Sequence, residues 1–92
     1  MAYVVSFDPT SHMTADQYDE VIKQLDAAGA GAPPGRLHHV SFGSPDDLHV
    51  IDIYDSMESF ERFGATLLPI LASLGIDPGE PRIAEAHNII RG

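Results

Sequence analysis

The fold follows from one stretch of the chain, in which a strand runs directly into a helix. This stretch is Asp47-Leu-His-Val-Ile-Asp-Ile-Tyr-Asp-Ser-Met-Glu-Ser-Phe-Glu-Arg-Phe63. Residues 48–54 are rich in β-branched and aromatic side chains, which fit a pleated and mostly buried surface. Asp55 then has the composition of a helix N-cap, and Glu58 stands three residues later, as in a capping box. We therefore predict a strand over residues 48–54 and a helix that begins at Asp55.

The N-terminal part of the chain contains a strand and a helix. Residues 3–7 form a short apolar run before a turn, which predicts a strand. Thr14 with Gln17 predicts a second capping box, and the helix after it should end near Gly29. One face of this helix is apolar at the spacing i, i+3, i+4 and i+7, in Tyr18, Val21, Ile22 and Leu25.

The rest of the chain adds two strands and completes the second helix. Residues 36–42 predict a strand that pairs as a hairpin with 48–54 across the turn-rich residues 43–47. Pro69 lies inside the second helix, where it predicts a kink or the start of another short helix. Residues 82–90 predict the last strand. The buried stripe of the second helix is expected to be Phe60, Phe63, Leu67, Leu71 and Leu74.

The order β-α-β-β-α-β over residues 1–92 predicts one α+β domain, a ferredoxin-like four-stranded antiparallel sheet with both helices on one face. If Ile51 and Ile53 point at the helices, with Ala84, Ala86 and Ile90, the opposite rows are left uncovered. These rows are too apolar for water, so we expect a homodimer that pairs sheet to sheet. They consist of Leu48, Val50, Asp52 and Tyr54, and of Ile83, Glu85, His87 and Ile89.

Composition excludes several classes of partner. The formal net charge of the 92 residues is −9, which repels nucleic acid and anionic membrane surfaces. Neither a signal peptide nor a membrane-spanning segment is predicted. The chain has no cysteine, which is compatible with a reducing compartment, and we expect a cytoplasmic protein.

Three polar residues on the strands are candidates for catalysis. His39, Asp52 and His87 lie on three different strands, and we expect them to converge in one cavity as a proton-transfer group. An acid in the middle of an apolar row is costly to bury without a partner, so Asp52 is either paired structurally or tuned for acid–base chemistry. The side chains expected to bind a substrate are Tyr54, Leu37, Val50 and Ile83. His38 and His49 should lie on the opposite rows.

Other interpretations of the same residues remain open. His39 and His87 can be interface or core histidines that a neighbour satisfies. With Asp52 they can also form a two-histidine, one-carboxylate site for a redox metal, although the spacing shows no metal motif and we predict no metal. Tyr54 is more often a core aromatic than a catalytic phenol.

The chain resembles the dimeric α/β-barrel superfamily, and within it the small proteins similar to the antibiotic biosynthesis monooxygenase domain. The resemblance covers nearly the whole chain and rests on residues 13–19, residues 34–40, residues 49–56 with Phe60 and Phe63, and His87-Asn88. It implies two ferredoxin-like subunits that pair into a barrel with a lumen under each sheet. The superfamily includes cofactor-free oxygenases of aromatic polyketides, haem-degrading enzymes, isomerases of small aromatic or lactone substrates, and proteins without known activity.

From the residues and the resemblance together we expect a cofactor-independent oxygenase or an isomerase of a small hydrophobic or aromatic substrate. A histidine paired with an acid can take a proton from a phenol or an acidic carbon, and the carbanion can react with oxygen without a cofactor. The alternatives are a non-enzymatic ligand carrier or accessory dimer and, third, a haem-binding protein that uses His39 or His87.

Overall fold

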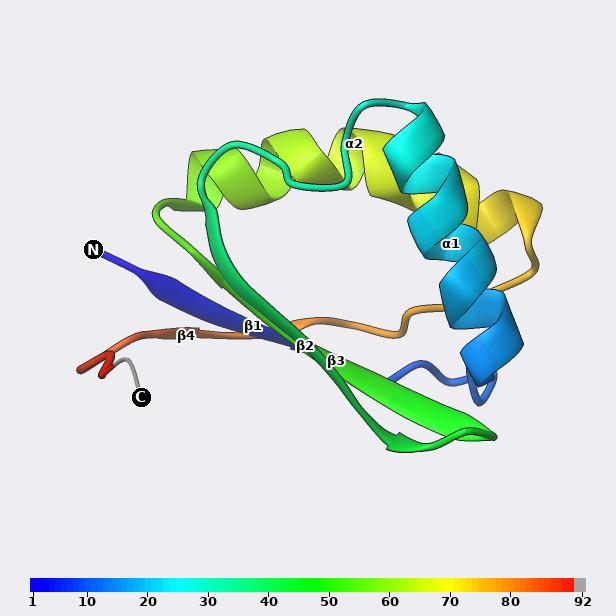
Figure 1. The fold of residues 1–92 in the computed structure, drawn as a ribbon. Helices are drawn as coiled ribbons and strands as arrows, with labels where there is room; N and C mark the ends of the chain where they lie inside the picture. The colour runs from blue at the N-terminus through cyan, green and yellow to red at the C-terminus, as the bar shows by residue number, and fades with distance from the viewer. Residues whose placement is uncertain (91–92) are drawn as a thin grey trace.

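The computed structural model describes residues 1–90. It contains β1 (Tyr3–Phe7), α1 (Ala15–Ala27), β2 (Arg36–Ser44), β3 (Asp47–Tyr54), α2 (Met57–Ser73) and β4 (Arg82–Glu85). The strands form one antiparallel sheet in the order β2-β3-β1-β4. Both helices lie on the same side of this sheet, and the other side is left uncovered by any helix (Figure 1). The predicted ferredoxin-like α+β fold is confirmed.

The first helix begins as the sequence predicts. The Thr14 side chain accepts a hydrogen bond from the Gln17 backbone N–H, and the Gln17 side chain accepts one from the Thr14 N–H, which completes the capping box. Val21 and Leu25 of the predicted stripe are buried, and Tyr18 and Ile22 pack partly buried against the same core. Gly29, at φ 76°, follows the helix end.

The cap of α2 lies one residue later than predicted. Ser56, not Asp55, has the extended backbone of an N-cap, with φ −157° and ψ 160°, and its hydroxyl accepts a hydrogen bond from the Ser59 N–H. The predicted Asp55–Glu58 box is therefore wrong, because Ser56 supplies the cap acceptor instead. Asp55 accepts a hydrogen bond from the Ser59 hydroxyl. Glu58 pairs with Arg62 on the exposed face.

Helix α2 is one element from Met57 to Ser73 with Pro69 inside it, so no separate helix starts at this proline. Pro69 has no N–H to donate to the preceding turn. The helix is held instead by its buried stripe. Of the predicted stripe residues, Phe63 and Leu71 are buried, and the other three pack partly buried against the core, namely Phe60, Leu67 and Leu74.

The sheet faces the helices with the opposite row from the one predicted. Asp52 and Tyr54 are buried beneath the helices, at 2% and 0% exposure, together with Val5 of β1. Val5 lies opposite Asp52, and Val4 lies opposite Ile53, so Ile51 and Ile53 lie on the uncovered face. The prediction was wrong because both rows are apolar. Alternation fixes which residues share a face, but it does not say which face the helices cover.

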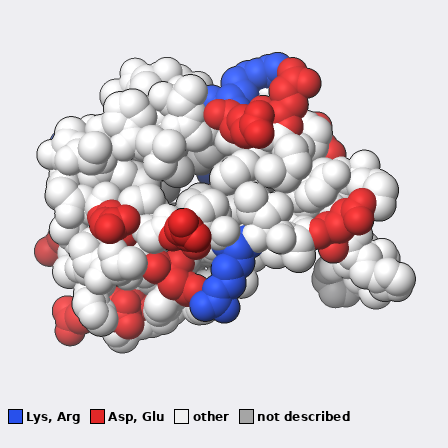
Figure 2. Space-filling model, turned by 180° about the vertical axis from the view of Figure 1, so that it is seen from behind, with Lys and Arg blue, Asp and Glu red and all other residues white. Residues whose placement is uncertain are grey.

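The uncovered face remains apolar with this exchange of rows. In β2 its row consists of His38, Val40 and Phe42, and Val40 and Phe42 are exposed. Figure 2, which views the molecule from behind and not directly onto this face, shows acidic side chains scattered over a mostly uncharged surface, with few basic ones. No helix within residues 1–90 is long and apolar enough to cross a membrane.

Two irregularities alter the edge strands. A β-bulge between Arg36 and His38 removes Leu37 from the regular alternation. Strand β4 ends at Glu85, five residues before its predicted end at position 90, so His87 follows the strand instead of lying within it.

Gly35 precedes β2 at φ 86°. A Cβ there would come within 2.1 Å of the Ser59 hydroxyl oxygen, so only glycine fits this approach of β2 to α2.

Candidate functional site

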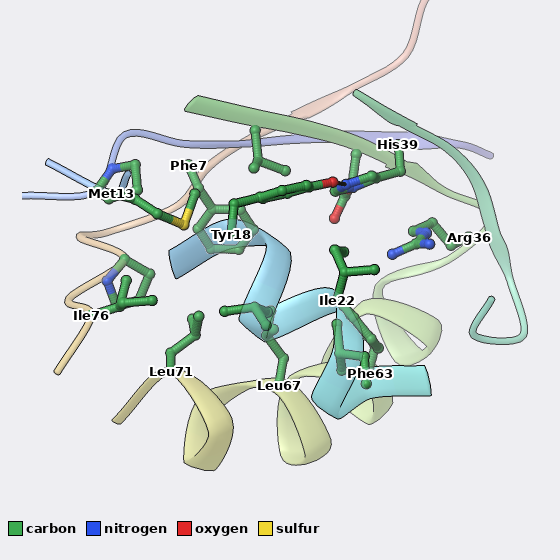
Figure 3. A pocket seen from close by; sticks show the side chains of 16 residues that line it. Phe7, Met13, Tyr18, Ile22, Arg36, His39, Phe63, Leu67, Leu71 and Ile76 are labelled. Carbon is green, nitrogen blue, oxygen red and sulfur yellow. Dashed lines mark hydrogen bonds and ion pairs between the residues drawn. The ribbon is translucent and has the colours of Figure 1, made fainter. Parts of the chain in front are cut away.

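A small cavity lies between the helix-facing side of the sheet and the two helices (Figure 3). Its volume is about 60 Å³. Apolar side chains form most of the wall, and they come from β1, α1, β3, α2 and the segments that flank them. Among the described residues, four polar side chains also line it: Tyr18, Arg36, His39 and Asp52. An apolar cavity with a few convergent polar groups is the usual form of a small-molecule site.

Three of these side chains, together with Tyr54 behind the wall, form a continuous chain of hydrogen bonds. The Tyr18 hydroxyl lies 2.6 Å from His39 Nε2, and His39 Nδ1 lies 2.5 Å from Asp52 Oδ1. The Tyr54 hydroxyl donates to Asp52 Oδ2 at 3.0 Å. No buried side-chain nitrogen or oxygen within residues 1–90 lacks a partner. The chain Tyr18–His39–Asp52–Tyr54 is the polar relay of the molecule.

The direction of each hydrogen bond in the polar relay follows for the state with Asp52 ionised and His39 neutral, which is the state in which a histidine can act as a base. An ionised carboxylate only accepts, so Asp52 takes one hydrogen bond from the Tyr54 hydroxyl and one from His39 Nδ1–H. Nε2 of the neutral imidazole is then an acceptor, and the Tyr18 hydroxyl donates to it. This is the arrangement in which a carboxylate orients a histidine and Nε2 serves as the base.

Tyr54 holds the far end of the polar relay. Burial raises the pKa of its phenol well above the ordinary value of 10.0, the adjacent Asp52 raises it further, and Arg36 opposes the shift slightly. The phenol therefore stays protonated and remains a donor to Asp52 at all ordinary pH values. Its ring is fixed by edge-on contact with Phe60, at 5.4 Å between centroids.

The hairpin and the start of α1 are tied together, which places Tyr18 against His39. Ala15 N–H donates to the Pro45 carbonyl at 2.7 Å, and Leu48 N–H donates to the Met13 carbonyl at 2.8 Å. Tyr18 follows one turn later on the same helix. Its ring and the His39 ring are nearly coplanar, with planes 6° apart and centroids 6.0 Å apart. Since the hydroxyl reaches Nε2, the two rings lie end to end across the cavity (Figure 3).

Arg36 brings a positive charge to the wall of the cavity. Its Nη2 donates to the Gly31 carbonyl at 3.0 Å, and its guanidinium carbon lies 5.4 Å from the centroid of the Phe63 ring. Among the described residues that line the cavity, it is the only lysine or arginine. Sequence reasoning missed this residue, because a single arginine at the start of a strand carries no motif.

The structure brings together only part of the predicted site. His39 and Asp52 are hydrogen-bonded, and Val50 lines the cavity with them. Tyr54 is buried and reaches the cavity only through Asp52. His87 lies elsewhere, in a hollow of about 530 Å³ on the uncovered face that also includes Val4 and Ile53.

The other two predicted binding residues are also apart from the cavity. Leu37 is exposed because the β-bulge turns it out of the row of His39. Ile83 lies opposite Val5 on the helix-facing row, but it is exposed at the β4 edge. His38 and His49 lie on the rows opposite to His39 and Asp52, as predicted, but these rows form the uncovered face and not the helix-facing one.

Tyr18 is the member of the polar relay that the sequence did not reveal. It occupies an apolar position of an amphipathic helix, where a tyrosine is usually a core residue. The one available signal was a phenol on the stripe of a helix that must cover an acid in the middle of a strand.

A redox-metal site would need His39, Asp52 and His87 to meet, and within residues 1–90 no group of three or more potential ligands is close enough to hold a metal ion.

Comparison with solved structures identifies the fold. No family model and no curated protein matches the sequence. The structure is similar to SnoaB, a cofactor-independent oxygenase from Streptomyces nogalater, with a TM-score of 0.62, 21% identity, and coverage of 99% of this chain and 96% of that chain. It is also similar to a candidate antibiotic biosynthesis monooxygenase from Chloroflexus aurantiacus, with a TM-score of 0.62, 19% identity, and coverage of 99% and 98%.

A further candidate antibiotic biosynthesis monooxygenase, from Deinococcus radiodurans, gives a TM-score of 0.63 at 13% identity, with coverage of 99% of this chain and 97% of that chain. The predicted resemblance to antibiotic-biosynthesis-monooxygenase-like proteins is thereby confirmed at the level of the fold. Because identities this low carry no information on individual side chains, the chemistry of this protein rests on its own residues.

Proposed function

We propose that the protein is a cofactor-independent oxygenase that removes a proton from a small aromatic substrate in the cavity between sheet and helices. The observation that carries the proposal is the position of His39 at the wall of an apolar cavity, with Nδ1 hydrogen-bonded to Asp52 and Nε2 directed at the Tyr18 hydroxyl. The fold is shared with a protein named as a cofactor-independent oxygenase, which supports the oxygenase over an isomerase.

The proposed reaction begins with proton transfer to His39 Nε2. The imidazolium that forms is stabilised by Asp52, and Tyr54 holds that carboxylate in place. Arg36 at the cavity wall stabilises the negative charge that develops on the substrate. For a substrate whose proton is lost from an acidic CH₂ group, or from the hydroxyl of its enol form, the resulting carbanion reduces O₂ and binds it at that carbon as a peroxide. The peroxide takes the proton back from His39 Nε2, and loss of water, which removes the second hydrogen of the CH₂ group, leaves a carbonyl. One oxygen atom enters the product and the other leaves as water, so no external reductant is needed.

The partner that we propose is a second copy of the chain. The uncovered face carries Val40 and Phe42 exposed, beside Ile51 and Ile53, and an apolar sheet face of this kind is normally covered. Pairing of two such faces gives a homodimer with two cavities, one on the far side of each sheet. This is the dimer expected from the sequence, with the opposite row of β3 at the interface.

A second candidate function is a non-enzymatic carrier or structural dimer. Two observations favour it: the cavity measures about 60 Å³, and the polar relay is complete without a ligand. A cavity of about 150 Å³ holds benzene, so a one-ring substrate in this smaller cavity requires a side chain to move. Haem, the third alternative, is far larger and would have to displace Tyr18 from Nε2 as well.

Substrate turnover separates the oxygenase from the carrier. Oxygen uptake is measured with one- and two-ring hydroxyarenes and with 1,3-dicarbonyl compounds, for the wild type, His39→Ala and His38→Ala. We expect His39→Ala to lower the rate by about 10²- to 10⁴-fold, the usual contribution of a positioned base. His38→Ala is the matched control, since it removes the adjacent histidine on the uncovered face. Equal rates in the two variants would contradict the assignment of His39.

A further inference from the structure

The Tyr18 ring fills the space that a substrate needs. It extends across the cavity to His39 and packs against the hydrophobic core (Figure 3). The volume that remains, about 60 Å³, is less than half of the roughly 150 Å³ of a cavity that holds benzene. Tyr18 itself is only partly buried, so part of the residue is already in contact with solvent.

His39 Nε2 is blocked by the same residue. Its lone pair accepts the Tyr18 hydroxyl at 2.6 Å, and Nδ1 is held by Asp52, so the imidazole has no free acceptor. Any substrate that is to transfer a proton to Nε2 must first displace the Tyr18 hydroxyl. A substrate without a hydroxyl would leave a partly buried acceptor unpaired, whereas one phenol in place of another keeps the number of hydrogen bonds constant.

We propose that the substrate is a planar hydroxyarene whose ring hydroxyl takes the place of the Tyr18 hydroxyl on His39 Nε2. This inference rests on the proposed function and narrows its substrate class. Tyr18 acts as an internal stand-in for the substrate. Until a phenol enters, its ring fills the space of the substrate ring and its hydroxyl donates to Nε2. A carboxylate ligand fits less well, because it brings no proton to Nε2 and would stand close to the Asp52 carboxylate.

The ligand exchange is tested with a matched pair of probes, 4-fluorophenol and fluorobenzene, which differ only in the hydroxyl. Their dissociation constants are measured by ¹⁹F NMR titration with the wild type and with Tyr18→Phe. The variant keeps the ring and removes the hydroxyl that competes for Nε2. We expect it to bind 4-fluorophenol about fivefold more tightly than the wild type, the factor that one ordinary hydrogen bond supplies. Its affinity for fluorobenzene should rise by the same factor, because fluorobenzene must also displace Tyr18. Both proteins should prefer 4-fluorophenol over fluorobenzene, because only the phenol can pair with Nε2.

Three results would overturn the inference. Weaker binding of 4-fluorophenol by Tyr18→Phe would mean that this hydroxyl contacts the substrate directly. Unchanged affinity for both probes would show that ligand binding does not displace the Tyr18 hydroxyl, and absence of binding by either protein would show that no phenol enters. If Tyr18→Phe does not fold, His39→Leu replaces it as the test. This variant lacks Nε2, so it should bind the two probes equally, and a retained preference for 4-fluorophenol contradicts the exchange.

Different results would remove the Tyr18 exchange and the oxygenase. Oxygen uptake that depends on His39, together with weaker phenol binding by Tyr18→Phe, leaves the oxygenase standing and removes the stand-in role. Hydroxyl-dependent binding without turnover of any substrate leaves the exchange standing and favours the carrier.

Discussion

The two faces of the sheet are similarly apolar, but only one of them is covered. On the helix-facing side, Asp52 is 2% exposed and every polar atom around it is paired. On the uncovered side, Val40 is 53% exposed and the hydrophobic side chains near it lack any cover. A polar chain beside an apolar cavity has the form expected of a small-molecule site, whereas a bare apolar row has the form expected of a surface that another protein covers.

The largest effect should come from removing the centre of the polar relay. Asp52→Ala leaves the buried Tyr54 hydroxyl and His39 Nδ1 without their acceptor, so we expect a loss of about 3 kcal/mol in the free energy of unfolding. Urea unfolding at a fixed protomer concentration measures it. Asp47→Ala is the control. It removes a surface partner of His12 and His49 and should cost less than about 1 kcal/mol. Similar losses in both would mean that the polar relay does not stabilise the fold.

The next effect concerns the uncovered face. Val40→Asp places a charge in the proposed interface twice, once per subunit, and we expect the dimer dissociation constant to rise about 100-fold, equivalent to about 2.7 kcal/mol. Leu68→Asp is a matched control on α2, because Leu68 has the same 53% exposure. Light scattering over a dilution series gives the molar mass. A wild-type monomer at micromolar concentration, or equal loss of dimer in both variants, would remove this face as the interface.

The smallest effect is the alkaline limit of stability. The folded-state pKa of Tyr54 is raised above its unfolded value of 10.0, so the protonated phenol stabilises the fold below pH 10 and this contribution is lost as the pH rises further. The loss is at most about 1.4 kcal/mol per pH unit. Tyr54→Phe has no group to ionise there. The difference in unfolding free energy between the wild type and this variant should therefore shrink above pH 10, and a constant difference would contradict the shift.

Most of the fold followed from local signals in the sequence. The Thr14 capping box, the strand at residues 3–7 and the hairpin all form where their turn and cap residues predict them. His39 and Asp52 were predicted to share one face, and they are hydrogen-bonded. Period-two alternation within the strands decides which residues share a face. This prediction was therefore correct although the helices cover the other face.

The errors concern information that no single segment carries. The side that the helices cover depends on the packing of both, and the two rows of β3 were too similar in hydrophobicity to decide it. The predicted convergence of His87 with His39 failed because β4 ends at Glu85 and His87 lies on the other face. The meeting of Tyr18 with His39 depends on how α1 lies over the hairpin, which period and propensity do not specify.

Three of the four members of the polar relay come from one hairpin. His39 and Asp52 are directly opposite each other on β2 and β3, and Tyr54 is two residues further along the same strand. Only Tyr18 is supplied by α1. The base and the groups that hold it therefore form a self-contained unit, while the residue that fills the slot belongs to another part of the chain. Such a division allows mutation of the helix to change which molecules are admitted during evolution while the unit that handles the proton stays intact.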